Sequence, residues 1–128
     1  MFTPGQAIWI PSGPRHDPQR EHLHFVAART AGPPPQVMLV SLCSIVGNSY
    51  DASTVLLSGD HPCIQHPSYI NYRHTRIERE DVLERGVGLR QFRIAEDCTE
   101  EVLQKIRGGL AVSAFAAPYT REFLREAD

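Results

Sequence analysis

The chain has 128 residues, with 13 Lys and Arg residues against 15 Asp and Glu residues and a formal net charge of −2. This length fits one domain, residues 1–128, that is large enough to bury its own core. The near-neutral charge argues against a dedicated nucleic-acid scaffold, but it leaves room for an enzyme that handles RNA in one local groove.

The first half of the chain predicts short β-strands separated by proline-rich loops. β-Branched and aromatic residues at 6–10 favour a strand that ends at Pro11. Residues 22–29 alternate as a strand does, with His22 and His24 on one face. Residues 37–42 are apolar on both faces, which is typical of a central buried strand.

The second half predicts three more strands and a stiff connector. A short strand is expected at 54–57, and the two His-Pro pairs at 61–67 favour an extended, non-helical segment. Residues 68–78 alternate as a strand that places Tyr72, His74 and Arg76 on one side. A final short strand is expected at 92–95.

Helices are expected only toward the C-terminus. A helical turn at 79–85 should end at Gly86, and the clearest helix should begin near Asp97 or Thr99. The pair Gly108 and Gly109 is expected to end or kink that helix, and one more short helix is expected in 118–128. Five or six short strands with a terminal helix predict a mainly β fold, a strongly bent sheet or β-barrel.

The cysteines and the first residues predict a cytoplasmic location. Cys43, Cys63 and Cys98 are odd in number and form no CxxC pair, which favours a reducing compartment. Residues 1–5 show no signal pattern, and the apolar runs are too short to span a membrane. We therefore expect no membrane partner.

The order of these elements resembles that of the PemK/MazF toxin family, which shares an SH3-like barrel with the CcdB toxin. The matching segments are an opening strand, a basic loop, a second strand, a third strand that ends in a small hydroxyl residue, and a later polar and basic strand: residues 4–10 (PGQAIWI), 15–20, 22–28, 42–44 (LCS) and 72–78 (YRHTRIE). The chain departs from the family at 21–24 (EHLH), where the family has an Arg-Pro, and in its His-Pro connector.

The resemblance implies an SH3-like barrel of PemK/MazF type and a toxin-like endoribonuclease that cuts single-stranded RNA without metal. It alone implies a homodimer and an antitoxin protein as partner. The alternative is a catalytically inactive barrel that binds a protein or peptide, so whether the chain is an enzyme stays open. No cofactor is predicted.

Metal-independent RNA cleavage needs a group that helps the 2′-hydroxyl attack the phosphate and a cation that stabilises the phosphorane. The resemblance assigns Arg20 to the cation and Ser44 to a polar contact. Histidines are suited to the proton transfers because their pKa lies near neutrality, and His22 and His24 are the first candidates. The competing interpretation makes Arg20 a solvated loop charge and Ser44 a strand terminator.

Substrate binding is predicted around the connector and the strand that follows it. Tyr69 and Tyr72 beside Arg73 and Arg76 are suited to stack on bases and hold phosphates, and His61 is a further candidate. The alternative is a rigid loop that enters an edge strand with half-buried tyrosines. The proposal requires the loop after the first strand, the end of the third strand and the connector to meet at one concavity.

The sequence leaves two other chemistries open, a metal site and a cysteine nucleophile. His22 and His24 would need a third group for a metal, and the candidates are Asp60, His61 and His66, but no HExxH or Cys/His finger spacing supports a site. Cys63 lies between two histidines, yet free cysteines are most often small buried hydrophobes. We therefore predict no metal.

Overall fold

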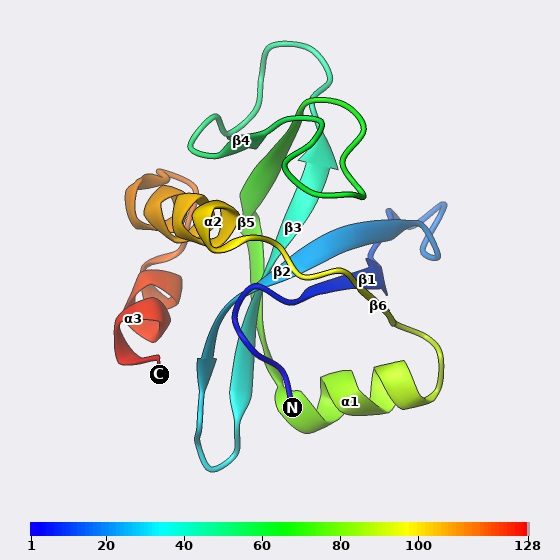
Figure 1. Ribbon diagram of the computed structural model, residues 1–128, viewed down its shortest axis with the longest axis vertical. Helices are drawn as coiled ribbons and strands as arrows, with labels where there is room; N and C mark the ends of the chain where they lie inside the picture. Colours follow the sequence, from blue (N-terminus) through cyan, green and yellow to red (C-terminus); the bar gives the residue numbers. More distant parts are fainter. Residues whose placement is uncertain (128) are drawn as a thin grey trace.

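The computed structural model describes residues 1–127 and is built on one six-stranded antiparallel sheet with the order β4-β5-β3-β2-β1-β6. The sheet is curled, and three helices pack around it (Figure 1). The elements are β1 (Ala7–Pro11), β2 (Glu21–Thr30), β3 (Gln36–Ser44), β4 (Val55–Leu56), β5 (Ser68–Arg79), α1 (Glu80–Gly88), β6 (Arg93–Ala95), α2 (Glu100–Val112) and α3 (Pro118–Glu126). The expected mainly β, barrel-like fold with a C-terminal helix is confirmed.

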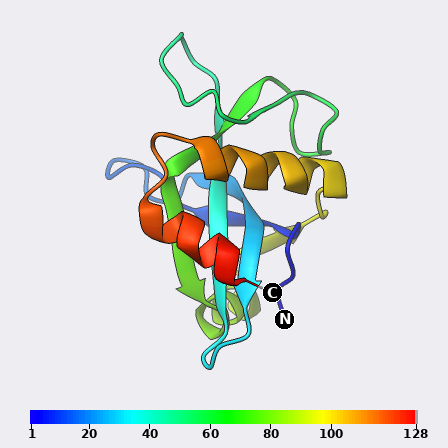
Figure 2. The ribbon, with the colours of Figure 1, turned by 90° about the vertical axis from the view of Figure 1, so that its left-hand side faces the viewer.

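The first face of the sheet carries the larger core. Alternate residues such as Phe25 on β2, Val40 on β3 and Ile70 on β5 are fully buried, and they pack in one cluster with Ile106 of α2 and Phe123 of α3. Figure 2 shows these two helices side by side across this face. Within residues 1–127 no helix is long and apolar enough to cross a membrane.

Helix α2 begins where the sequence predicts and continues past the predicted end. The Thr99 side chain accepts a hydrogen bond from the backbone N–H of Val102 at 3.2 Å, so Thr99 is the N-cap. The helix does not stop at the glycine pair, because Gly109 packs directly against Thr54 and Tyr72 of the sheet layer. Glycine is needed at this position because α2 approaches the sheet closely there, and it does not end the helix.

The opposite face of the sheet is covered only in part. Helix α1 places Leu83 over Ile8, Val26 and Leu39 in a second buried cluster. At its first residue, Glu80 accepts two hydrogen bonds from the Arg29 guanidinium, each at 2.9 Å, and one from the backbone N–H of Phe2. These contacts attach the N-terminal segment and α1 to one half of this face.

The other half of this face is polar. His22 and His24 share the face with Ile8 and Ile10, since β1 and β2 pair Ile8 with His24 and Ile10 with His22. Ser41 lies beside His24 on β3. The candidate site therefore occupies the part of the sheet that α1 leaves open.

Candidate active site

The site begins where β2 and β3 separate. Their ladder runs from Thr30 opposite Gln36 to His24 opposite Ser41, and it stops there. Beyond that point Glu21–Leu23 pair only with β1, while Leu42–Ser44 pair only with β5. The two strands diverge (Figure 1) and leave a gap in the sheet.

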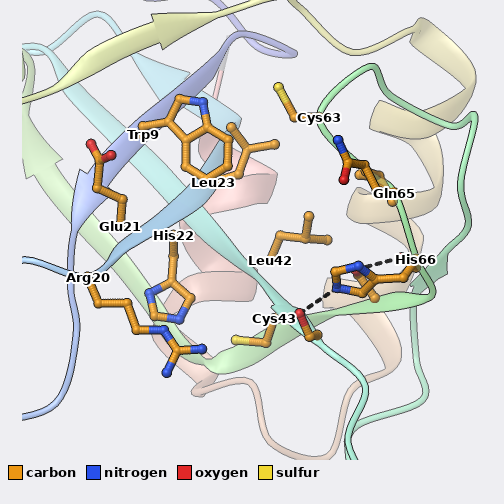
Figure 3. A pocket seen from close by; sticks show the side chains of 13 residues that line it. Trp9, Arg20, Glu21, His22, Leu23, Leu42, Cys43, Cys63, Gln65 and His66 are labelled. Carbon is orange, nitrogen blue, oxygen red and sulfur yellow. Dashed lines mark hydrogen bonds between the residues drawn. The ribbon is translucent and has the colours of Figure 1, made fainter. Parts of the chain in front are cut away.

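The first hollow fills this gap and has a volume of about 160 Å³. It is lined by Arg20 from the loop after β1, His22 from the start of β2, Ser44 from the end of β3 and His66 from the His-Pro connector. Figure 3 shows Arg20 and His22 at one end and His66 at the other. The three segments that the sequence required to meet do share one concavity.

Ser44 and His66 form a hydrogen-bonded pair. The Ser44 Oγ lies 2.7 Å from the His66 Nε2, and both side chains are exposed in the hollow. The backbone around His66 is held, because its carbonyl accepts the Ser68 hydroxyl at 3.0 Å and the next carbonyl, of Pro67, accepts the N–H of Ile45. The sequence offers His66 as a metal ligand or as a neighbour of Cys63, and only the tertiary fold pairs it with Ser44.

His22 is half-buried and lies in a short hydrogen-bond chain. The Ser12 Oγ lies 3.2 Å from the carbonyl oxygen of Ile10 and 2.9 Å from the Nδ1 of His22, so Nδ1–H donates to Ser12 in the tautomer in which the Ser12 hydroxyl donates to Ile10. This tautomer leaves Nε2 as the basic nitrogen. Burial lowers the pKa of His22, and the positive charges of Arg20 and His74 lower it further.

His24 lies deeper, with 2 % of its surface exposed. Its Nδ1 donates to the carbonyl of His22 at 2.9 Å, and burial lowers its pKa to about 4. The ring is therefore neutral near pH 7 and is not a proton donor for a substrate. It forms the floor of a second hollow of about 210 Å³, which shares His22 and Cys43 with the first and also includes His74 and Arg76.

Tyr72 and His61, which the sequence predicts to bind substrate, are buried and line neither the first nor the second hollow. Tyr72 is 1 % exposed, and its hydroxyl bonds Thr54 at 2.7 Å and the carbonyl of Ile106 at 2.6 Å. His61 is 2 % exposed, accepts the N–H of Cys63 and donates to a backbone carbonyl. Tyr72 links β5 to α2, and His61 links the connector to the segment that precedes α2.

A shift of register in β5 explains why Tyr72 does not lie on the same side of the strand as His74 and Arg76. The pairing with β3 is interrupted between Leu39 and Ser41, so β5 has extra residues there. Tyr72 stays on the core side, but His74 and Arg76 move to the open face. An uninterrupted alternation, as the sequence predicts, would place all three on one side.

The other predicted substrate residues lie on the open face. Arg76 lines the second hollow and pairs with Glu78 at 2.7 Å, while Tyr69 and Arg73 line a third hollow next to it. No group of three or more His, Cys, Asp or Glu side chains in residues 1–127 is placed to hold a metal ion. Cys43, Cys63 and Cys98 are free thiols.

The first hollow thus combines an arginine, two histidines and a serine hydroxyl from three separate segments. The guanidinium supplies a permanent positive charge and five N–H donors, and imidazole is a side chain suited to proton transfer. No family model, no curated protein and no solved structure matches the chain.

Proposed function

We propose that this protein is a metal-independent endoribonuclease that cuts single-stranded RNA in the first hollow. The observation that carries the proposal is the convergence of Arg20, His22 and the Ser44–His66 pair at the separation of β2 and β3. These side chains supply each chemical role that the cleavage requires.

In the proposed reaction the ribose 2′-oxygen attacks the adjacent phosphorus, and the bond from phosphorus to the 5′-oxygen breaks. The products are a 2′,3′-cyclic phosphate and a free 5′-hydroxyl. His22 accepts the proton of the 2′-hydroxyl at Nε2, because its lowered pKa keeps this nitrogen unprotonated near pH 7. His66, across the hollow, returns a proton through the Ser44 hydroxyl to the departing 5′-oxygen.

Arg20 stabilises the charge that develops on the phosphorane. Its side chain is exposed at the hollow, and no ion pair holds it within residues 1–127. A positioned cation acts most strongly where charge develops in the transition state. An antitoxin partner and a homodimer, which the family resemblance implies, stay predictions.

The test is cleavage of a fluorescent single-stranded RNA by the purified protein in a buffer that contains EDTA. We expect fragments that end in a 2′,3′-cyclic phosphate and no cleavage of the all-deoxy oligonucleotide. The variants R20A, H22A and H66A should each lower kcat/KM by about 100-fold or more. Expression in cells should arrest growth, and R20A should relieve the arrest.

Matched controls come from the loop that carries Arg20. Arg15 and His16 are exposed in that loop and lie outside the first hollow, so R15A and H16A should leave kcat/KM unchanged. Intact RNA after incubation with the wild-type protein would contradict the proposal and would favour the inactive binding module. Equal activity of the wild type and the three site variants would contradict the assignment of the hollow.

A further inference from the structure

The third hollow lies beside the second hollow on the open face, so the three hollows follow one another across this face. It has a volume of about 380 Å³ and is lined mainly by Tyr50, Tyr69, Asn71, Arg73 and Phe115. It shares His74 with the second hollow, which in turn shares His22 and Cys43 with the first. A chain that enters the first hollow can therefore continue without leaving this face.

The third hollow contains an aromatic pair. The ring centroids of Tyr50 and Tyr69 lie 5.4 Å apart, with the planes inclined by 39°. Both residues are half-buried, so each ring is held by the protein and still borders the hollow. Tyr69 is the β5 partner of Cys43, which lines the first hollow, so the pair lies one strand away from the proposed active site.

Polar groups surround the aromatic pair. The Arg73 guanidinium lies over the exposed ring of Phe115 at 4.7 Å, and no ion pair neutralises it within the described part of the chain. The Asn71 amide donates to His74 Nδ1 at 3.1 Å and keeps its oxygen as an acceptor. Asp51 lies on the wall with a lowered pKa, and its negative charge repels a phosphate from that side.

We propose that the third hollow is a nucleobase-binding subsite for single-stranded RNA. One unpaired base stacks on the Tyr50–Tyr69 pair, and Arg73 holds the phosphate next to that base. The proposal rests on the function assigned to the first hollow only for the identity of the strand as RNA. A base is the occupant that fits, because it offers a flat apolar surface to the rings and a polar edge to Asn71.

The experiment measures binding, so it does not depend on catalysis. A fluorescent 2′-O-methyl RNA 9-mer, which lacks the attacking hydroxyl, is titrated with the protein and followed by anisotropy. Nine further oligonucleotides each carry one abasic residue. With the wild-type protein we expect one abasic position to weaken binding about tenfold, as the loss of one stacked base predicts.

The variant Y50L should bind the unmodified oligonucleotide about tenfold more weakly and should lose the sensitivity to that abasic position. Y50F keeps the ring and should behave as the wild type. Y119L removes an exposed tyrosine of α3 outside the hollow and is the matched control.

Three results would overturn the subsite: no saturable binding of the 9-mer, no sensitive abasic position, or the same sensitivity in Y50L as in the wild type. A peptide ligand in this hollow would give the first or the second of these. Cleavage of RNA without the abasic effect would contradict the subsite alone. The abasic effect without cleavage would contradict the catalytic proposal alone.

Discussion

The four histidines of the open face differ in what surrounds them. His66 and His74 are exposed, His22 is half-buried beside Arg20, and His24 is buried under the second hollow. Burial disfavours the charged imidazolium, so it lowers the pKa of His22 and lowers the pKa of His24 to about 4. One residue type therefore serves both as proposed proton carrier and as neutral core residue.

At this scale we predict that His24 makes folding sensitive to pH. Its pKa is about 4 in the folded protein and near 6.5 in the unfolded chain, so between these values only the unfolded chain takes up the proton. The contribution of the neutral His24 to the free energy of unfolding is complete above about pH 6.5 and should fall by about 3 kcal/mol as the pH drops to 4. Urea denaturation followed by Trp9 fluorescence measures this loss.

The variant H24Q has no proton to gain at this position and should lose much less stability over the same pH interval. H16Q, which changes an exposed loop histidine, should keep the wild-type dependence on pH. Parallel curves for wild type and H24Q between pH 7 and pH 4 would contradict the assignment of the buried neutral ring.

At the scale of elements, α2 is fitted closely to the sheet. Arg107 reaches back from the helix, and its Nε donates to the carbonyl of Ala27 at 2.8 Å, at the irregularity in the β2–β3 ladder. The Thr54 hydroxyl donates to the carbonyl of Lys105 at 3.1 Å. The helix thus satisfies polar groups of the sheet, and the sheet satisfies polar groups of the helix.

The adjacent glycines of α2 provide a matched pair of variants. A Cβ on Gly108 meets nothing within 4 Å, so G108A should raise the free energy of unfolding by about 1 kcal/mol through helix propensity. A Cβ on Gly109 overlaps Thr54 and the Tyr72 hydroxyl, so G109A should lower it by about 2 kcal/mol. Thermal or denaturant unfolding of the two variants measures the difference, and a stabilised G109A would contradict the close approach.

At the scale of the whole molecule, one sheet separates two hydrophobic clusters. Phe25 and Val40 belong to the cluster under α2 and α3, whereas Val26 and Leu39 belong to the cluster under α1. Because neighbouring residues of the same strands enter both clusters, neither cluster can lose its order without disturbing the sheet.

We therefore predict a single cooperative unfolding transition. I106A in the first cluster and L83A in the second should each lower the free energy of unfolding by about 3 kcal/mol, since both side chains are almost completely buried. Far-UV circular dichroism and Trp9 fluorescence should report the same midpoint for each variant. A separate early transition in L83A would show instead that α1 and its cluster unfold independently.

Local patterns predicted the elements well, because they depend on near neighbours. Proline positions and alternation predicted the strands of the first half, and the start of α2 was expected near Asp97 or Thr99, of which Thr99 is the N-cap. Helix α1 was predicted to stop at Gly86, but it continues to Gly88. Glycine is a weak stop signal where the surrounding packing favours another turn.

The sequence by itself determined the mainly β class and the approximate strand boundaries, and the function predicted from it required three separate segments to converge. Only the tertiary structure decided which polar side chains reach the site, because that choice depends on partners far away in the chain. The buried Tyr72 donates to the carbonyl of Ile106, 34 residues away, and Ser44 contacts His66, 22 residues away. A register shift in β5, which no local pattern encodes, sets the side on which the later residues face.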